Sequence, residues 1–378
     1  MSGWPGKIVI GLTGNIATGK SVVRKMLEHL GAYGIDADAL GHRAIAKGAP
    51  GYQPVLNTFG RWLLGPDEQI DRAKLARIVF SDPEALSRLE AIVHPLVRQA
   101  VDILVRRARE RVIVLEAIKL LESPLRASCD SQWTTYAPPE VQLSRLVQKR
   151  AMTPAAARQR ILAQSAQEEK MAVANVVIHN DGTFEDTWRQ VSAAWTTMFP
   201  AVKTEPLKPI SPAVQGQMMV EKARPRHAAE IAALINRLSN GQRALKSEDI
   251  MAAFGEKAFL FLKVDNRTVG LVGWQVENLV ARTDDVYLEP GLSLPAAMRA
   301  LLTTVENTSR DLQCEATLLF LPEPLAQQAE VWRNLGYEAR TVQTLGVRAW
   351  QEAAQETMGA GESMYFKQLR KDRVLRPV

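Results

Sequence analysis

One stretch decides the fold of the first half of the chain: Gly14-Asn15-Ile16-Ala17-Thr18-Gly19-Lys20-Ser21. It fits the pattern G-x-x-x-x-G-K-[S/T], in which backbone N–H groups surround phosphate oxygens. The apolar run 7–12 leads into it, and the segment 20–30, with apolar residues at helical spacing, leads out of it. This order puts the positive end of a helix dipole at the phosphates. The stretch therefore predicts a phosphate-binding loop rather than a glycine-rich turn that binds nothing.

Two side chains of this loop suit phosphate chemistry. The ammonium group of Lys20 can reach the β- and γ-phosphates of a nucleoside triphosphate, and the Ser21 hydroxyl can bind Mg²⁺. We therefore take 14–22, which ends at Val22, as the ATP-binding segment. Within it Lys20 is a candidate catalytic residue and Ser21 the candidate metal ligand.

Two acids, Asp36 and Asp38, come at the end of the expected second strand. Ligands gather at that end of the strands in an open parallel sheet. Alternate residues of an extended chain point to opposite sides of it, so we expect only one acid to face the transferring phosphate. A carboxylate there can accept the proton of an attacking hydroxyl or position Mg²⁺. A capping or turn aspartate is the alternative, and it suits Asp36 better than Asp38.

The chain of 378 residues has room for two domains, and four prolines between Pro200 and Pro212 predict a semi-rigid linker. We assign 1–199 to the first domain, 200–216 to the linker and 217–378 to the second. Short apolar runs alternate with helical patterns before the linker, which indicates an α/β domain with a parallel sheet. The second domain has a mixed α+β pattern.

The second domain should begin with a strand and a helix over 228–238. Two strands, 258–264 and 268–276, then form a hairpin. The remaining expected elements are a helix over 295–311, a strand over 316–320 and a helix over 330–335. We expect the basic tail from Lys367 to Arg376 to be frayed and solvated.

Composition excludes several classes of protein. Hydrophobic residues make up 46% and charged residues 23% of the chain, which is typical of globular proteins. Only two cysteines are present, which excludes a disulfide framework and a cysteine-based zinc site. No apolar run approaches the roughly 18–20 residues that cross a bilayer, and the first residues do not resemble a signal peptide. A net charge of +6 suits nucleic acid or any other polyanionic ligand, such as a nucleotide, and the chain has no nucleic-acid-binding motif, so charge alone does not choose between them. We expect a cytoplasmic protein that binds neither nucleic acid nor membranes.

Beyond the phosphate-binding loop, the first half of the chain resembles the dephospho-coenzyme A kinases over about 7–195. The resemblance rests on many short matches in the family's order. They are Leu12 to Ser21, Leu30-Gly31-Ala32, Ile35 to Asp38, Gly48-Ala49-Pro50, Phe59-Gly60, Ile70-Asp71-Arg72, Leu75, Val79-Phe80, Leu89-Glu90, His94-Pro95, Pro139 to Leu146, Arg160-Ile161, Gln164, Lys170 and Val177 to Gly182.

The resemblance implies a P-loop nucleoside-kinase-like sheet with a helical lid. It also implies an enzyme that transfers the γ-phosphoryl group of ATP to the ribose 3′-hydroxyl of dephospho-CoA. Asp38 would be the general base, His94 would lie beside the acceptor, and 145–164 would form the lid over ATP. The lid cations that would neutralise phosphoryl charge are Arg145, Lys149, Arg150 and Arg160. Lys149 and Arg150 could instead belong to a solvated helix end.

Three departures from the family pattern bear on activity. The family usually has glycine where this chain has Asn15 and Ala17, and alanine tolerates left-handed backbone poorly. An acid followed by Pro-Leu-Leu in the family becomes Glu116-Ala117-Ile118-Lys119 here, so a charge enters a wall near the acceptor. Glu116 can still hold Mg²⁺ through water. The family's arginine followed by an acid is Lys149-Arg150-Ala151 here, and lysine lacks the planar fork of arginine.

The second half, about 218–369, resembles the GNAT acetyltransferases in its hairpin and in the late helix that ends Leu335-Gly336-Tyr337. That family binds the acetyl-CoA pyrophosphate at a glycine-rich turn before a helix, usually with an arginine. The corresponding stretch 288–298 keeps Gly291, lacks the arginine and gains Pro295. We therefore expect a domain that senses an acyl-CoA ligand or serves as a scaffold.

Three functions remain open from the sequence. The first is a dephospho-CoA kinase with a diverged GNAT-like domain. The second is a non-catalytic protein that responds to CoA or a nucleotide, and the third is an acetyltransferase with a P-loop partner domain. The missing pyrophosphate turn disfavours the third.

Overall fold

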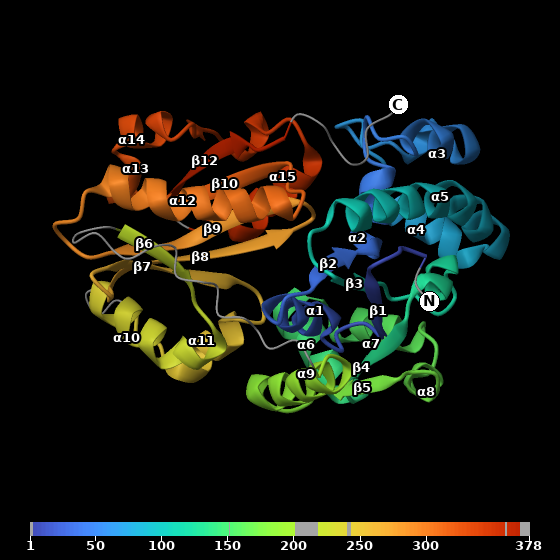
Figure 1. The fold of residues 1–378 in the computed structure, drawn as a ribbon. Helices are drawn as coiled ribbons and strands as arrows, with labels where there is room; N and C mark the ends of the chain where they lie inside the picture. Colours follow the sequence, from blue (N-terminus) through green and yellow to red (C-terminus); the bar gives the residue numbers. More distant parts are fainter. Residues whose placement is uncertain (1–2, 151, 201–217, 240–242, 360, 371–378) are drawn as a thin grey trace.

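Two β-sheets organise the computed structural model, one in each half of the chain (Figure 1). The structure describes residues 3–150, 152–200, 218–239, 243–359 and 361–370. The expected linker, 200–216, lies outside these ranges except for Pro200, so its position stays a prediction. Within the described residues, no helix combines the length and the apolar character needed to cross a membrane.

The N-terminal sheet has five parallel strands in the order β2-β3-β1-β4-β5. Its strands are β1 Ile8–Gly14, β2 Tyr33–Asp36, β3 Val112–Glu116, β4 Ser131–Tyr136 and β5 Val176–His179. Every residue of β3 is buried. Strands covered on both faces need such continuous apolar runs, because helices pack on each side of a parallel sheet. The expected α/β class is confirmed.

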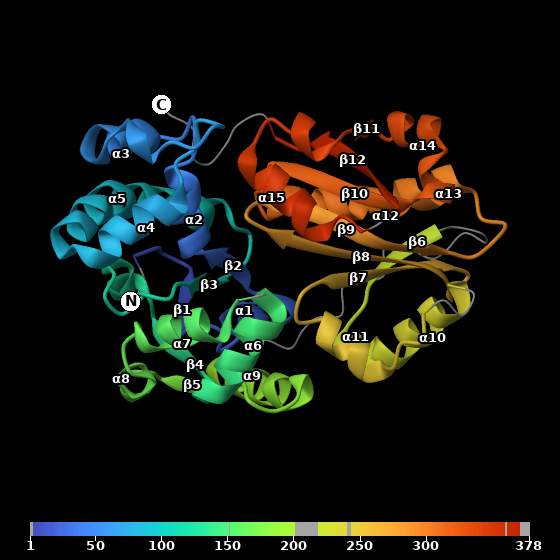
Figure 2. The same cartoon turned by 180° about the vertical axis from the view of Figure 1, so that it is seen from behind.

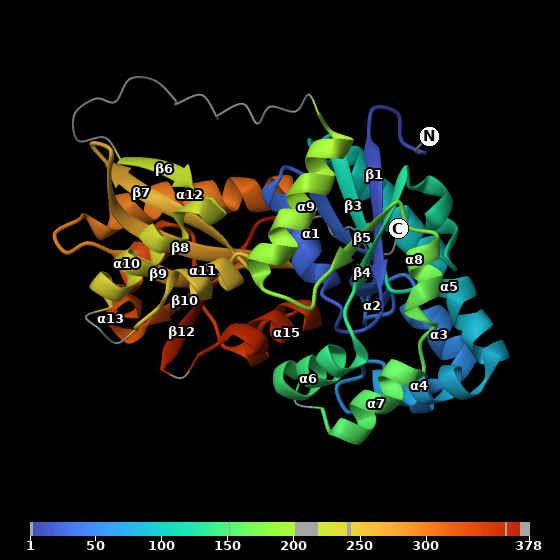
Figure 3. The same cartoon turned by 90° about the horizontal axis from the view of Figure 1, so that it is seen from below.

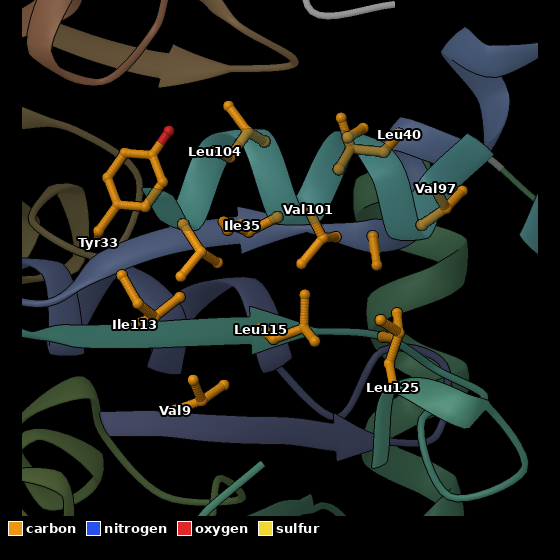
Figure 4. Close-up of a cluster of buried hydrophobic side chains, with 14 of the residues drawn as sticks. Val9, Tyr33, Ile35, Leu40, Val97, Val101, Leu104, Ile113, Leu115 and Leu125 are labelled. Carbon is orange, nitrogen blue, oxygen red and sulfur yellow. The ribbon is translucent and has the colours of Figure 1, made fainter. Parts of the chain in front are cut away.

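Helices cover both faces of this sheet. On one face α1 (Lys20–His29) and α9 (Phe184–Met198) bury a core that includes Trp133. On the other face lie α2 (Ala37–Ala44) and α5 (Pro83–Arg107). Figure 4 shows Val101 and Leu104 of α5 above Ile35, Ile113 and Leu115 of the strands.

Further helices surround the carboxyl ends of the strands. One group packs around its own small core and contains α3 Tyr52–Phe59 and α4 Arg72–Ser81. The other contains α6 Pro139–Arg150, α7 Pro154–Leu162 and α8 Gln167–Ala172. Figure 3 shows α6 and α7 side by side at one end of the sheet. The segment expected to form a lid is therefore helical.

The C-terminal sheet has seven strands in the order β11-β12-β10-β9-β8-β7-β6. They are β6 Met218–Lys222, β7 Ala258–Val264, β8 Arg267–Glu277, β9 Val280–Leu288, β10 Ala316–Pro322, β11 Glu338–Ala339 and β12 Glu362–Gln368. The helices are α10 Ala228–Leu238, α11 Ser247–Ala253, α12 Leu294–Asp311, α13 Glu323–Ala326, α14 Ala329–Asn334 and α15 Arg348–Thr357. All pairings are antiparallel except β9 with β10, so the expected α+β class is confirmed.

One expectation for this half was wrong, and strand β9 was not predicted. That strand pairs with β8. The tail was expected to fray from Lys367, but that residue lies in β12, and its Nζ donates hydrogen bonds to Glu306 at 2.7 and 2.8 Å. The two sheets lie side by side, with the β8–β9 end directed toward β2 and α2, as the front and back views show (Figures 1 and 2).

Candidate active site

The phosphate-binding loop, 14–21, connects β1 to α1 and needs glycine at both of its glycine positions. Gly14 and Gly19 have φ of 146° and 93°, which L side chains rarely adopt. A Cβ on Gly14 would lie 2.3 Å from the hydroxyl oxygen of Thr135, and one on Gly19 would lie 1.8 Å from the side-chain nitrogen of Asn180. Both the backbone angles and the available space therefore exclude side chains here.

The two departures in the loop have different consequences. Ala17 has φ of 60°, so the chain keeps a left-handed residue without glycine. That conformation costs an L-residue about 1–2 kcal/mol. The side chain of Asn15 donates a hydrogen bond to the carbonyl of Ser165 at 2.8 Å, which attaches the loop to the segment between α7 and α8.

Lys20 is buried at the start of α1 with its ammonium group turned toward the loop. Its Nζ donates to the carbonyl oxygens of Gly14 and Asn15 at 3.0 and 3.1 Å. Burial lowers the pKa of Lys20, while the negative charges of Glu116 and Asp38 act to raise it. Lys20 therefore lies in the electrostatic range of both carboxylates.

Glu116 ends β3 next to β1 and joins two residues of α1. Its Oε1 accepts a hydrogen bond from the Ser21 hydroxyl at 2.9 Å, and its Oε2 accepts one from Arg24 Nε at 2.7 Å. The side chain is buried. A hydroxyl and a carboxylate side by side are the oxygen ligands that suit Mg²⁺. Sequence reasoning missed Arg24, because a cation on an amphipathic helix usually indicates a solvated face.

The two aspartates differ in surroundings and in the contacts that hold them. Asp36 caps α2, and its Oδ1 accepts from the Ala39 N–H at 2.8 Å. Burial, reinforced by the charge of Glu116, raises the pKa of Asp36 to about 6. Asp38 lies in the first turn of α2, and its Oδ2 accepts from the Ile118 N–H at 3.0 Å. Burial also raises the pKa of Asp38, against the opposing effects of that hydrogen bond and of Lys20.

The expectation that the two acids lie on opposite sides of an extended chain was wrong, because β2 ends at Asp36 and Asp38 is already helical. The alternative role foreseen for Asp36, that of a capping residue, is confirmed.

Two side chains, those of Arg145 and Asn180, contact the backbone of the phosphate-binding loop from outside it. Arg145 of α6 donates from Nη1 to the Ala17 carbonyl at 3.1 Å and from Nη2 to the Asn180 carbonyl at 2.7 Å. Burial lowers the pKa of Arg145. Asn180 follows β5, and its side chain donates to the Thr18 carbonyl at 2.9 Å. Its position directly after a strand was the signal that could have marked it as a loop contact.

The amide of Ile16 donates to the side-chain oxygen of Gln164 at 2.7 Å, so the end of the expected lid contacts the loop directly. Arg160 is exposed on α7. Lys149 and Arg150 lie in α6, but their side chains are outside the described part of the chain.

The remaining candidates lie farther out. His94 is exposed on α5, one residue after Val93, which would contact a Cβ placed on Gly41 of α2. Among the hydrogen bonds and ion pairs found for the described residues, none joins His94 to the phosphate-binding loop. The charge of Lys119 lies 3.5 Å from Glu90 of α5, with 56% of the side chain exposed.

Lys170 is a buried cation that sequence reasoning passed over. It lies in α8, and its Nζ donates to the Ile118 carbonyl at 3.1 Å. Thr13 donates to the same carbonyl at 3.0 Å, so residue 118, whose N–H holds Asp38, is fixed from both sides. Burial lowers the pKa of Lys170. Its place in the matched motifs was the available signal.

Comparisons with known proteins identify relatives of the first half of the chain. Residues 8–186 match the family model described as dephospho-CoA kinase. The dephospho-CoA kinase of Geobacter metallireducens is 43% identical over 191 residues, which make up 50% of this chain and 95% of that protein.

Solved structures resemble each half. TT1252 from Thermus thermophilus is 32% identical with a TM-score of 0.47, and the match covers 51% of this chain and 98% of that one. An acetyltransferase from Streptococcus agalactiae is 19% identical with a TM-score of 0.33, and the match covers 41% of this chain and 99% of that one.

The resemblance to dephospho-CoA kinases that the motifs indicated is thus confirmed by two findings. The match covers nearly the whole length of the relative, and the family model spans the phosphate-binding loop, Asp38 and Glu116. The chain belongs to the dephospho-CoA kinase family.

Proposed function

We propose that this chain is a dephospho-CoA kinase that transfers the γ-phosphoryl group of ATP to the ribose 3′-hydroxyl of dephospho-CoA. The products are coenzyme A and ADP. The observation that carries the proposal is the convergence of Lys20, the Ser21–Glu116 pair and Asp38 at the carboxyl ends of β1, β3 and β2. The likeness to dephospho-CoA kinases supports the choice of substrates.

ATP binds with its phosphates in the loop 14–21. The amides of the loop and the N-terminus of α1 surround the β- and γ-phosphates. The Lys20 ammonium group leaves the Gly14 and Asn15 carbonyls and donates to phosphate oxygens instead. Arg145, which contacts the loop through the Ala17 carbonyl, neutralises charge on the transferring group.

Ser21 and Glu116 are the residues that would hold Mg²⁺, because their oxygens are already paired at 2.9 Å. When bound, Mg²⁺ supplies charge neutralisation to the phosphates. Arg24 keeps the Glu116 carboxylate in place through its bond to Oε2.

Asp38 acts as the general base on the acceptor. Its Oδ2 is oriented by the Ile118 N–H, which leaves Oδ1 to accept the proton of the ribose 3′-hydroxyl. The oxygen then bonds to the γ-phosphorus while the bond from that phosphorus to the β–γ bridging oxygen breaks, and ADP leaves. The raised pKa of Asp38 makes its carboxylate a stronger proton acceptor than an ordinary aspartate. We place His94 and Asp36 at the edge of the acceptor site.

The test follows ADP release and CoA formation by purified protein with ATP, Mg²⁺ and dephospho-CoA. Asp38→Asn and Lys20→Met should each lower kcat by at least a hundredfold, since positioning and charge dominate phosphoryl transfer. Asp265→Asn, in the β7–β8 turn of the other sheet, is the matched control and should leave turnover unchanged. Wild-type turnover that survives both site variants would refute the proposal.

For the C-terminal domain we propose a GNAT-like scaffold in place of acetyl transfer. The turn before α12 carries the Glu289 carboxylate, which pairs with Arg237 at 2.9 Å and with Arg267 at 2.7 Å. The same turn has only one glycine, Gly291, before Pro295 in the first turn of α12, so it lacks the glycine-rich backbone that would surround a pyrophosphate. Thermal unfolding of the full chain with and without acetyl-CoA tests this, and a rise in Tm would favour the acyl-CoA-sensing alternative.

A further inference from the structure

The two domains contact each other along an interface, which we call the seam. In it, one turn of the C-terminal sheet packs against the kinase domain. Asn278 and Leu279 form a two-residue turn between the paired residues Glu277 and Val280 of β8 and β9. Both turn residues have positive φ, of 51° and 60°. Such hairpins favour Asn-Gly, because glycine adopts these angles without strain. Leucine at the second position is therefore strained, and some other contact must compensate for it.

The compensating contact lies in the other domain. Leu279 and Leu312 pack against the kinase core that contains Tyr33, Leu40 and Leu104. The Tyr33 hydroxyl donates to the Leu312 carbonyl at 3.2 Å. In Figure 4 the Tyr33 ring lies at one end of this core, with its hydroxyl turned away from the strands. The strained leucine thus has an apolar site that its own domain does not supply.

A buried ion pair lies next to this turn. Arg43 of α2 donates from Nη1 to the Asn278 carbonyl and from Nη2 to Glu315 Oε1 at 2.5 Å. The side chains of Arg43 and Glu315 are 11% and 1% exposed. Glu315 is attached to the same turn, because its N–H donates to the Leu279 carbonyl at 2.8 Å. One guanidinium therefore joins α2 to both the turn and the strand end beside it.

These contacts hold the two ends of the segment that carries the acids of the active site. Tyr33 begins β2, and Arg43 is in the last turn of α2. Asp36 and Asp38 lie between them. A second set of contacts reaches α1, where Lys25 Nζ donates to the Val276 carbonyl at 3.2 Å and His29 Nε2 to the Phe254 carbonyl at 2.8 Å.

We propose that the C-terminal domain contributes to the kinase site by positioning α2. Its β8–β9 turn and Glu315 hold this helix so that Asp38 faces the acceptor. Arg43 and Leu279 are positioning residues, since neither touches the reacting atoms. The proposal rests on the assignment of Asp38 as the general base. It gives the appended domain a role that requires no ligand.

Two substitutions in the full chain test the two contacts. Leu279→Gly removes the apolar contact but gives the hairpin its favoured Asn-Gly sequence, so the C-terminal sheet stays folded. Arg43→Ala removes the ion pair. Each should lower kcat at least tenfold and leave the KM for ATP within twofold, because the phosphate-binding loop is not changed. Hydrogen exchange of the amides 37–44 should become faster in both.

The matched control lies on the same seam. Arg109→Ala breaks a contact to Asp311 of 3.1 Å at which the arginine is 78% exposed, and it should change neither kcat nor exchange. Glu315→Gln combined with Arg43→Ala should lower kcat no further than Arg43→Ala alone, because both act through one contact.

The results separate this proposal from the assignment of the base. If Asp38→Asn abolishes turnover but Leu279→Gly and Arg43→Ala keep kcat within twofold of the wild type, the positioning role is refuted and the kinase site stands. A lower kcat without faster exchange over 37–44 also refutes it. Full turnover by Asp38→Asn refutes the base itself.

Discussion

Replacing an alanine inside a helix by glycine lowers the free energy of unfolding. The same replacement at Ala17 should leave the free energy of unfolding unchanged or raise it. Ala17 has φ of 60°, a conformation whose strain of about 1–2 kcal/mol glycine avoids. Glycine also adds unfolded-state entropy, which costs roughly 0.5–1 kcal/mol. A fully buried methylene group contributes about 0.8 kcal/mol, so the loss of a half-buried methyl that packs near Ile16 and Leu146 costs a fraction of that amount. The net change should lie between neutral and about 1 kcal/mol of stabilisation.

Ala193→Gly is the comparison that isolates the strain. Ala193 is exposed in the middle of α9, so its replacement should destabilise the same domain by about 1 kcal/mol. The entropy cost of glycine is common to both variants. The free energy of unfolding of Ala17→Gly should therefore exceed that of Ala193→Gly by about 1–2 kcal/mol.

The assay is urea unfolding of the full chain followed by circular dichroism, in which both variants report on one transition because both lie in the N-terminal domain. The KM for ATP should stay within twofold for Ala17→Gly, since the loop already has the shape that glycine favours. An equal loss of stability in the two variants would show that Ala17 is not strained, and the reasoning about the loop would fail.

Three further predictions concern the site. Gly19→Ala should abolish the rise in Tm caused by ATP, because its Cβ would lie 1.8 Å from Asn180; Gly31→Ala, with φ of 108° but no atom within 4 Å, should keep that rise. Asp36→Asn should weaken the pH dependence of the urea midpoint between pH 4 and 7. The folded pKa of Asp36, about 6, lies above its ordinary value, so the native state binds more protons there and the stability from this group is lost as pH rises; an unchanged pH profile in the variant would contradict this. Glu116→Gln should raise the Mg²⁺ concentration needed for half-maximal turnover at least tenfold, and an unchanged Mg²⁺ requirement would remove Glu116 from the metal site.

The features that could be predicted from the sequence are those specified by residues next to one another in the chain. The loop 14–21 needs its glycines, lysine and serine within one turn of chain, so a short pattern specifies both its shape and its chemistry. The parallel sheet follows from apolar runs such as 112–116, which are buried on both faces. The distinction between Asp36 and Asp38 was less visible, because the switch from strand to helix between them depends on the cap that Asp36 itself provides.

Strand β9 could not be recognised because it buries charge. Its sequence contains Arg282, Asp284 and Asp285, which interrupt the apolar alternation that marks a strand. The structure compensates those charges with residues distant in sequence: Lys257 donates to both aspartates at 2.7 Å, and Arg243 pairs with Asp285 at 3.0 Å. A local pattern cannot indicate a strand whose two aspartates are paired with cations 27 to 42 residues away.

The seam between the domains has even less local signal than strand β9. Its contacts join residues more than 200 positions apart, such as Arg43 with Asn278 and Tyr33 with Leu312. Two domains on one chain meet at an effective concentration of the order of millimolar, so few contacts are needed to keep them docked. Leu279, the Arg43–Glu315 ion pair and the hydrogen bonds of Tyr33, Lys25 and His29 then hold two domains together that, as separate proteins, would need a large apolar interface. Substitutions of Arg43 and Leu279 should affect the active site because these contacts reach α2 and the core beneath it, whereas the exposed Arg109–Asp311 contact does not.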